Sequence, residues 1–205
     1  SWMVKMMASE NKIIRVYYDF ACPFCYVGNE SAYRLEQEFG VDFEWIGWEI
    51  GPKVRKRGEV REKREHSFMI KRLAYDQNIV FSVPPVRANT RLAMEGAEYA
   101  KTQGKFREYF DRVMDEYWVR GTNISTLKTL VPIAESLGLD THEFAEALRS
   151  GLFRDRVLDD DEAERLDIQY VPTFIFGGFR VVGNVPFYVL REAVNVYVRG
   201  YEPPI

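Results

Sequence analysis

The chain has 205 residues, of which 46% are hydrophobic and 15% aromatic, and its formal net charge at pH 7 is -3. This is enough for one domain with a substantial core, and the near-balanced charge provides no general attraction to nucleic acid or to an anionic membrane. Charged residues interrupt every apolar run before the roughly 18 apolar residues that a membrane span needs. We therefore expect neither a nucleic-acid partner nor a membrane partner.

The first residues, SWMVKMMASENK, lack the apolar segment of roughly 7 to 15 residues that a secretory signal contains. We therefore expect a cytoplasmic protein, unless a signal was removed before the sequence begins. The chain has two cysteines, whereas a secreted fold stapled by disulfides would carry several pairs. The two cysteines are thus expected to serve chemistry rather than structure.

A strand, a helix and a second strand are predicted first along the chain. Residues 12–19, KIIRVYYD, are apolar and rich in strand-forming residues, and residues 23–39 follow with a helical pattern that Gly40 would close. Residues 41–50, VDFEWIGWEI, alternate as a half-buried strand does. The length of the crossover between the two strands favours parallel pairing.

A densely charged run, KVRKRGEVREKREH, follows the second strand, and we interpret it as a solvated linker and helix face rather than a basic binding patch. Long helical patterns come next. We predict helices over residues 60–78, 88–103, 105–119, 125–137, 141–150 and 153–167.

Several residues mark the ends of these helices. Asn89 or Thr90 can open the second helix, Ser125 can cap the fourth, and Asp140 or Thr141 can cap the fifth. Pro132 lies inside the fourth helix and is expected to kink it, because proline removes a backbone donor and clashes one turn back.

Strand patterns return at the end of the chain. Residues 173–182, TFIFGGFRVV, predict a hairpin around two glycines, and Pro186 opens an amphipathic terminal helix. The strands lie at both ends of the chain and the helices between them. The sequence therefore predicts an α/β fold with a mixed four-stranded sheet, in the order β-α-β … β-β-α, and a large all-helical insertion.

Cys22 and Cys25 form a C-x-x-C motif where the first strand meets the following helix. The start of a helix stabilises an anion through unpaired backbone amides and the helix dipole, and cysteines there have pKa values lowered to about 3.5–7.5. Cys22 would therefore be a thiolate nucleophile at neutral pH. Cys25 lies one turn later and is suited to resolving a mixed disulfide, and Pro23 fits as an early helical residue.

Three alternatives for the two cysteines remain open. A zinc site needs about four ligands, and the other candidates, His66 and His142, are not in ligand spacing, so we expect no metal. A structural disulfide across so short a loop would constrain little of the unfolded chain. Two buried, unreactive thiols are the third alternative.

A second signal lies at residues 170–174, YVPTF, where Val-Pro directly precedes a strand. With both signals the sequence resembles the thioredoxin-fold dithiol oxidoreductases, in the DsbA-like branch with FrnE-type proteins. The resemblance extends over nearly the whole chain, through DFACPFCYVG, WEIGP, NTRLAMEGAEYAKTQGKFREYFDRVMDEYWVRGTNIS, SLGLD and VPTFIFGGFRVVGNVPFYVL. It implies a thioredoxin-like domain of residues 11–58 and 159–205, with an inserted helical domain of residues 59–158.

The resemblance also implies roles for residues. Cys22 would be the nucleophile and Cys25 the resolving thiol, with Pro172 in the cis form opposite them. Val171 would offer backbone groups to an extended substrate. Further candidates for contact with the substrate are Pro23, Phe24, Thr173 and Trp48. Asp19 is a candidate proton acceptor or a residue that orients water near Cys25, and its structural alternative is helix entry or a solvated loop.

Phe24 stands where strongly oxidising family members carry histidine. A phenyl ring cannot donate a hydrogen bond to a thiolate, so the reduced form is less stabilised and the couple less oxidising. Basic residues after the second strand, Lys53, Arg55, Lys56 and Arg57, could add to thiolate stability, although exposed charges are well screened. We thus expect a reductase or isomerase rather than a strong oxidase.

The predicted function is thiol-disulfide exchange on protein or peptide disulfides. It would need no bound cofactor, only an external thiol or an electron donor of the thioredoxin or glutathione type. One alternative is a glutathione-dependent isomerase or kappa-type glutathione transferase, although those relatives carry serine where Cys22 stands. Another is a redox-sensing binding or chaperone module. A monomer and a homodimer are both open, because Tyr99, Tyr109 and Trp118 could form a dimer face or a core.

Overall fold

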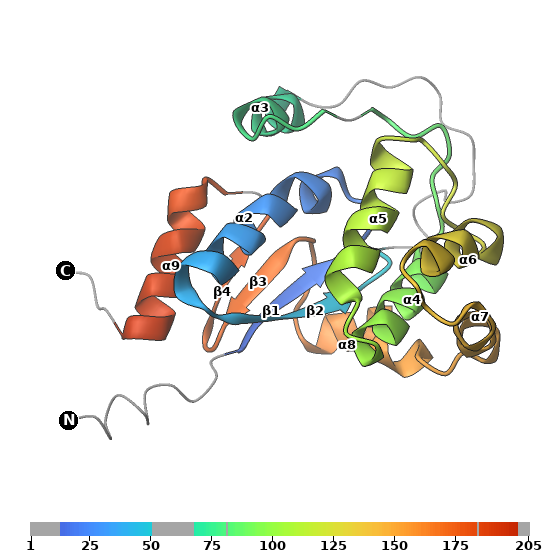
Figure 1. Cartoon of the computed structure of the whole chain (residues 1–205). Coiled ribbons are helices and arrows are strands. Elements are labelled where there is room, and N and C mark those ends of the chain that lie inside the picture. Colours follow the sequence, from blue (N-terminus) through green and yellow to red (C-terminus); the bar gives the residue numbers. More distant parts are fainter. Residues whose placement is uncertain (1–12, 51–67, 81, 184, 201–205) are drawn as a thin grey trace.

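The core of the molecule is a sheet of four strands. In the computed structural model, which describes residues 13–50, 68–80, 82–183 and 185–200, the strands lie in the order β2-β1-β3-β4 (Figure 1). Their bounds are β1 Ile13–Tyr18, β2 Asp42–Gly47, β3 Thr173–Phe176 and β4 Phe179–Val182. β1 pairs parallel with β2 and antiparallel with β3, and β3 pairs antiparallel with β4. The predicted fold class is confirmed.

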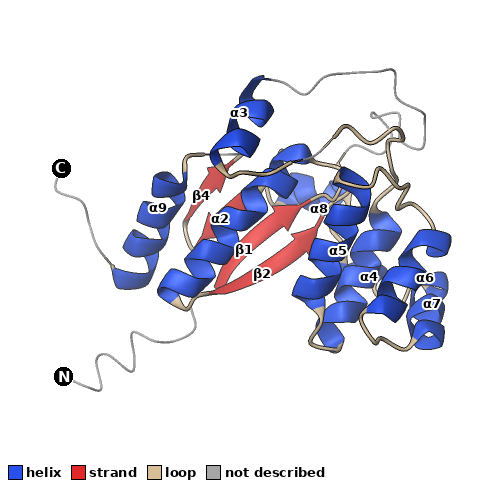
Figure 2. Ribbon diagram, turned by 45° about the horizontal axis from the view of Figure 1, so that its top comes forward, coloured by secondary structure: helices blue, strands red, loops and turns tan. Residues whose placement is uncertain are grey.

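Helices cover both faces of the sheet. α2 (Pro23–Phe39) connects β1 to β2, α9 (Phe187–Arg199) follows β4, and Figures 1 and 2 show the two side by side over one face. α8 (Asp160–Arg165) lies behind the sheet in both views. α2 ends at Gly40, whose φ of 61° is a left-handed conformation that glycine adopts readily.

The remaining helices belong to the segment between β2 and β3. They are α3 (Phe68–Asp76), α4 (Arg91–Thr102), α5 (Phe106–Trp118), α6 (Leu127–Ser136) and α7 (Thr141–Ser150). α4 packs against α5, α6 and α7, whereas α3 contacts α2 and stands apart from the other four (Figure 1). In the part of the chain that the structure describes, no helix is long and apolar enough to cross a membrane. Residues 53–57 and the first part of the helix predicted at 60–78 lie outside the described residues.

The predicted helix at 153–167 is wrong as a single element. A 3-10 helix at Arg154–Arg156 is followed by extended backbone and then by α8. The break has a non-local cause. Leu158 N donates to Gly47 O at 2.8 Å, and Leu158 pairs with Trp48 in an isolated parallel bridge just beyond the end of β2. Asp159 then starts α8 by accepting a hydrogen bond from Glu162 N at 2.7 Å.

The predicted helix caps at Asp140 and Ser125 differ in how they compare with the structure. Asp140 caps α7, with its carboxylate accepting from Glu143 N at 2.9 Å, as predicted. Ser125 does not cap α6, which begins after Thr126. The Ser125 hydroxyl instead accepts from Asn89 N at 2.9 Å and donates to Asn123 Oδ1 at 2.5 Å, so it joins the segments that lead into α4 and α6.

An aromatic cluster joins the sheet to the helical segment. The Tyr18 ring contacts those of Phe20 and Phe110 edge to face, with centroids 5.2 and 5.0 Å apart, and Trp45 lies 5.1 Å from Phe110. Trp118 Nε1 donates to Phe20 O at 2.8 Å, which fixes α5 to the loop after β1. That loop leads directly into the two cysteines.

The aromatic residues of the helical segment are core residues. Tyr109 and Trp118 are fully buried and Tyr99 is 2% exposed, so these three side chains fill the interior and do not form a dimer face. The division into residues 11–58 with 159–205 and residues 59–158 stays a prediction, as does the oligomeric state.

Candidate active site

Cys22 and Cys25 lie where β1 gives way to α2. Cys22 is the residue before the helix, with extended backbone at φ -95° and ψ 117°, and Pro23 begins the helix. The turn is closed by backbone hydrogen bonds: Cys22 N donates to Asp19 O at 3.0 Å, and Cys25 N donates to Cys22 O at 3.1 Å. The two thiols therefore meet at the first turn of α2, in the C-x-x-C arrangement that the motif predicts.

The two thiols are free and differ in acidity. Cys22 is 7% exposed and Cys25 is 3% exposed. The pKa of Cys22 is lowered, chiefly by a hydrogen bond from Cys25 and also by backbone N–H groups, against the opposing effect of burial. Burial raises the pKa of Cys25 well above the usual thiol value, and the neighbouring Cys22 raises it further. Cys22 is thus arranged to lose its proton more readily than Cys25.

A loop from the far end of the chain faces Cys22. The peptide bond between Val171 and Pro172 is cis, and Cys22 Sγ donates to Val171 O at 3.6 Å across 149 residues of sequence. β3 brings the loop there, because Thr173 pairs with Tyr17 on β1. The Thr173 side chain is 1% exposed and donates to Tyr170 O at 2.6 Å, so its hydroxyl holds the loop together.

Tyr170, which the sequence analysis did not single out, is 63% exposed directly before Val171. Its position in YVPTF, next to the residues assigned to substrate contact, was the signal that could have found it. Pro23 and Phe24 are half-buried beside Cys22. Trp48 is 7% exposed, and its indole N–H donates to Asp160 Oδ1 at 3.1 Å, so α8 occupies the polar end of this side chain.

Asp19 is buried at 1% exposure, which excludes the solvated loop. Its Oδ1 accepts from Ala21 N at 2.9 Å and from the Thr90 hydroxyl at 2.8 Å, and its Oδ2 accepts from Ile50 N at 3.2 Å. The negative charge of Asp19 opposes ionisation of both Cys22 and Cys25, and so contributes to raising the pKa of each. The carboxylate is therefore close enough to the dithiol to act on it electrostatically.

Glu49, a further residue near this site, was missed, and the contacts of Thr90 were not predicted. Glu49 accepts hydrogen bonds from Thr90 N and Arg91 N, each at 2.7 Å, and so caps the start of α4 from the end of β2. Thr90 was predicted to open α4, but its side chain makes no capping bond. No local sequence signal could have shown these contacts, because they join segments 41 residues apart.

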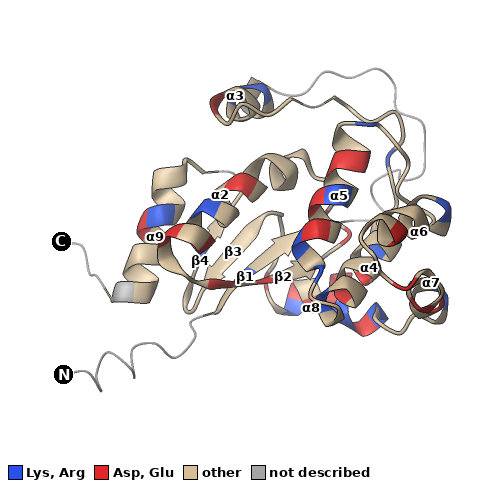
Figure 3. Ribbon diagram, viewed as in Figure 1, with Lys and Arg blue, Asp and Glu red and all other residues tan. Residues whose placement is uncertain are grey.

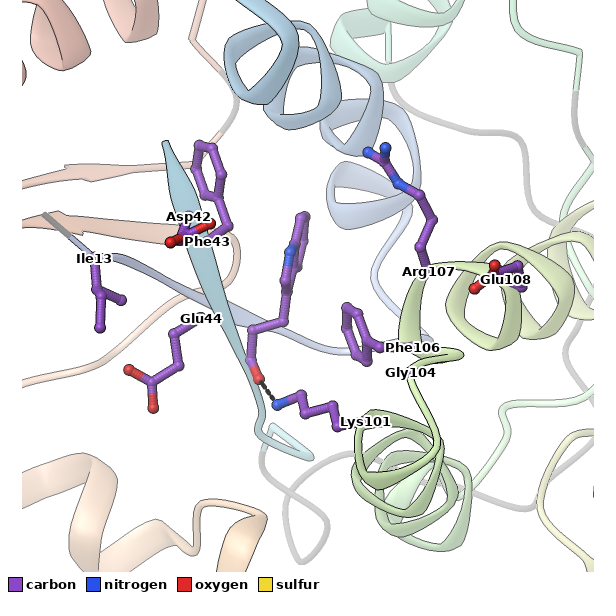
Figure 4. A pocket seen from close by; sticks show the side chains of 10 residues that line it. Ile13, Asp42, Phe43, Glu44, Lys101, Gly104, Phe106, Arg107 and Glu108 are labelled. Atoms are coloured by element: carbon purple, nitrogen blue, oxygen red, sulfur yellow. Dashed lines mark hydrogen bonds between the residues drawn. The ribbon is translucent and has the colours of Figure 1, made fainter. Parts of the chain in front are cut away.

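A separate pocket of about 660 Å³ lies at the outer edge of β2, beside the turn between α4 and α5 (Figure 4). Phe43, Trp45 and Phe106 line it, and Lys101 Nζ donates to Trp45 O across it. Ile13 and Asp42, which also line this pocket, begin β1 and β2, whereas Cys22 follows the other end of β1. The pocket is thus distinct from the dithiol site.

Among the described residues, no group of three or more His, Cys, Asp or Glu side chains could hold a metal ion. Charged residues of both signs are interspersed along α2, α5 and α9 (Figure 3).

Comparison with known proteins agrees with the geometry. The family described as DSBA-like thioredoxin domain matches residues 13–195. A Bacillus subtilis (strain 168) protein named YwbO and described as uncharacterized is 30% identical over 190 residues, which are 89% of this chain and 95% of the relative. A 2-hydroxychromene-2-carboxylate isomerase of Pseudomonas putida is 26% identical over 199 residues, 89% of this chain and 94% of the isomerase.

Two solved structures share the fold. A probable DsbA oxidoreductase from Streptomyces coelicolor, SCO1869, has a TM-score of 0.75 at 21% identity, with 94% of this chain and 92% of that chain covered. The cytosolic disulfide reductase DsbM from Pseudomonas aeruginosa, solved with GSH, has a TM-score of 0.64 at 16% identity, with 92% and 96% covered. The family match spans the dithiol, the helical segment and the cis-proline loop alike, and the chain belongs to the DSBA-like thioredoxin domain family.

Proposed function

We propose that this protein is a thiol-disulfide oxidoreductase that acts on protein or peptide disulfides through Cys22 and Cys25. The proposal depends mainly on one observation, that the free thiols of Cys22 and Cys25 lie together at the start of α2 and that Cys22 Sγ contacts Val171 O at 3.6 Å. The pKa of Cys22 is lowered and that of Cys25 is raised, so Cys22 is the more acidic thiol and the one suited to attack first in a stepwise exchange.

The reaction begins when the Cys22 thiolate attacks a substrate disulfide. A Cys22–substrate disulfide forms, and the substrate S–S bond breaks with release of one substrate thiolate. Cys25 then loses its proton, which we assign to Asp19, and its sulfur attacks Cys22 Sγ. The second substrate thiolate leaves, and a Cys22–Cys25 disulfide remains. Two electrons have passed to the substrate, and an external thiol of the thioredoxin or glutathione type restores the reduced protein.

The surroundings of Cys22 favour reduction or isomerisation over strong oxidation. The hydrogen bonds that lower its pKa come from Cys25 and from backbone N–H groups, and the phenyl ring of Phe24 adds none. A thiolate with fewer donors makes a less stable reduced form and hence a weaker oxidant. A cytoplasmic location, where thiols are kept reduced, fits this direction, and the structural neighbour DsbM is described as a cytosolic disulfide reductase.

Substrate recognition is assigned to the cis-proline loop. In the reduced protein the Val171 carbonyl accepts a hydrogen bond from the Cys22 thiol. This hydrogen bond is lost once the sulfur becomes a thiolate or enters a mixed disulfide. The carbonyl is then available to a backbone N–H of an extended peptide. The exposed ring of Tyr170 and the half-buried Pro23 and Phe24 would contact its side chains.

The decisive experiment uses the two single-cysteine variants, each of which leaves one thiol. With insulin or a disulfide-linked peptide as substrate, the wild type should turn over and Cys22→Ser should not. Cys25→Ser should accumulate mixed disulfides that gel electrophoresis resolves, and Cys22→Ser should accumulate none. Turnover that survives in Cys22→Ser would end the proposal.

A glutathione-dependent isomerase is the second candidate, and the relative from Pseudomonas putida favours it. Such a reaction needs no resolving thiol, so Cys25→Ser would retain it. Assay of 2-hydroxychromene-2-carboxylate with glutathione, in the wild type and in Cys25→Ser, separates the two functions. Specific binding of an unfolded protein that persists in both cysteine variants would point instead to a redox-sensing or chaperone module.

A further inference from the structure

A pocket of about 570 Å³ lies between α5 and α6, away from the pocket at the edge of β2. Arg112 and Glu116 line it from α5, Arg120 from just beyond the end of that helix, and Lys128 and Pro132 from α6. The first three follow one another at intervals of about one helical turn, so they lie on the same side of α5. The described residues that line this pocket include none from the dithiol turn or the cis-proline loop.

Arg112 sets this pocket apart. It is half-buried, and in the part of the chain that the structure describes its guanidinium forms neither a hydrogen bond nor an ion pair, although its Nε atom is buried. Glu116 is engaged elsewhere, because it accepts from the Thr122 hydroxyl at 2.7 Å and lies 3.9 Å from Arg120 Nε. Lys128, exposed on α6, likewise has no ion-pair partner among the described residues.

The lining of the pocket therefore carries uncompensated positive charge. Arg120 lies between two carboxylates, with its Nε 3.5 Å from Asp115 Oδ2 and 3.9 Å from Glu116 Oε2. The positive charges left without a counterion are those of Arg112 and Lys128. Withdrawing a guanidinium from water without a partner costs free energy, and buried polar atoms in proteins nearly always have one. An anion in this pocket would offset that cost.

The pocket at the edge of β2 differs in this respect. The cations among its described lining residues are both paired, Lys101 with Glu98 at 2.8 Å and Arg107 with Glu36 at 3.1 Å. Their charges are thus compensated within the protein. The combination of a cavity with unpaired cations belongs to the pocket between α5 and α6.

A phosphate monoester fits this lining better than a carboxylate does. It carries nearly two negative charges at neutral pH and three acceptor oxygens, whereas a carboxylate has one charge and two oxygens. Arg112 and Lys128 match the two charges, and a guanidinium matches the geometry of phosphate oxygens. The Thr126 side chain also lines the pocket and makes no capping bond to α6, so its hydroxyl can donate to a third oxygen. Pro132 and Ile133 provide an apolar wall for the organic part of the ligand.

We propose that the pocket between α5 and α6 is a binding site for a small organic phosphate monoester, whose phosphate group is held by Arg112 and Lys128. No covalent step is involved. The site stands apart from the dithiol, so this inference and the proposed function can fail independently of each other.

The test uses phenyl phosphate as the probe and the full chain as the protein, with isothermal titration calorimetry to measure the dissociation constant. Phenylacetate, a carboxylate of similar size, and uncharged phenol are the comparison ligands. We expect phenyl phosphate to bind and to raise Tm with increasing concentration, and the other two to bind at least about tenfold more weakly. Added salt should weaken the binding, because exposed Lys128 contributes through its charge.

Substitutions then locate the site. Arg112→Met should weaken binding of phenyl phosphate by roughly ten- to a hundredfold, and Lys128→Met by roughly two- to fivefold. Arg112→Lys keeps the charge without the planar fork and should lie between the wild type and Arg112→Met. Arg149→Met, which removes an exposed charge on α7 outside this pocket, is the matched control and should bind as the wild type does.

Folding and turnover are checked in the same variants. Arg112 has no hydrogen-bond or ion-pair partner to lose among the described residues, so Arg112→Met should be at least as stable as the wild type in urea. Should that variant fail to fold, Arg112→Lys and Lys128→Met carry the test. Reduction of insulin should be unchanged in all of them, since the dithiol is not altered.

Three results would overturn the inference. They are no binding of phenyl phosphate to the wild type at up to about 10 mM, equal affinity for phenylacetate, and equal affinity of Arg112→Met and Arg149→Met for the probe. Amide signals in nuclear magnetic resonance spectra give a further check, because the probe should shift those of α5 and α6. Shifts confined to the dithiol turn would place the phosphate elsewhere and refute this site.

Discussion

Gly96, in the middle of α4, is the position where the smallest substitution should have a large effect. A Cβ there would lie 2.2 Å from the Tyr109 hydroxyl oxygen, 2.8 Å from its Cζ and 3.0 Å from Phe144 Cζ. Tyr109 is fully buried, and its hydroxyl donates to Ala93 O at 3.0 Å. Gly96→Ala must therefore displace the ring and break this hydrogen bond.

The cost follows from three contributions. Loss of the hydrogen bond costs about 1 kcal/mol, and overpacking of the core costs about 1–3 kcal/mol. The higher helix propensity of alanine returns about 1 kcal/mol. The net loss is about 2 kcal/mol, which in a protein of this size lowers Tm by roughly 4–8 °C.

Urea unfolding followed by circular dichroism measures this change. The midpoint should fall while the slope of the transition stays the same. Gly178→Ala is the matched control, because a Cβ there meets no atom within 4 Å and the backbone is not left-handed. Equal stability of Gly96→Ala and Gly178→Ala would refute the close packing of α4 against α5 and α7.

Three further predictions concern the dithiol site. Phe24→His adds a hydrogen-bond donor near the Cys22 thiolate and should raise the reduction potential, measured in equilibrium with glutathione, by roughly 30–60 mV. Phe24→Leu adds no donor and should leave the potential unchanged. An unchanged potential in Phe24→His would contradict the role given to this position. The pKa of Cys22 in the folded protein lies below the unfolded thiol value of about 8.5, so between these two pKa values the unfolded state binds more protons than the folded state. The stability of the reduced protein should therefore rise with pH across that window. Urea titrations at several pH values should show this rise in the wild type and not in Cys22→Ser. The raised pKa of Cys25 costs stability only above the unfolded value, outside that window. Tyr170→Ala should lower kcat/KM for a peptide disulfide by roughly threefold to tenfold with little change in stability, whereas Tyr188→Ala, 71% exposed on α9, should leave it unchanged.

Sequence reasoning was strongest where the determining interactions are local. Cys22 directly precedes α2 because Pro23 favours a helix start, and Gly40 ends that helix because its left-handed conformation suits glycine. The hairpin of β3 and β4 likewise follows from its two central glycines. Each of these features depends on a few adjacent residues, so a single sequence was enough to place them.

Features that depend on distant partners could not be predicted in this way. The helical pattern of residues 153–167 gave no sign that Leu158 would pair with Gly47 at the edge of β2. The hydroxyl of Thr90 looked like a helix cap because the carboxylates that engage it, Asp19 and Glu49, lie far away in sequence. Tertiary contacts outweighed the local preference in both cases.

The backbone at the edge of β2 has a consequence for how the protein behaves among copies of itself. Carbonyl groups along an exposed strand edge are templates on which a strand of another chain can grow, and this is a common start of aggregation. Here the carbonyl of Trp45 accepts a hydrogen bond from Lys101 Nζ, and the carbonyl of Gly47 accepts one from Leu158 N. A foreign strand would have to displace a buried backbone segment and an ammonium group before it could extend the sheet on this side.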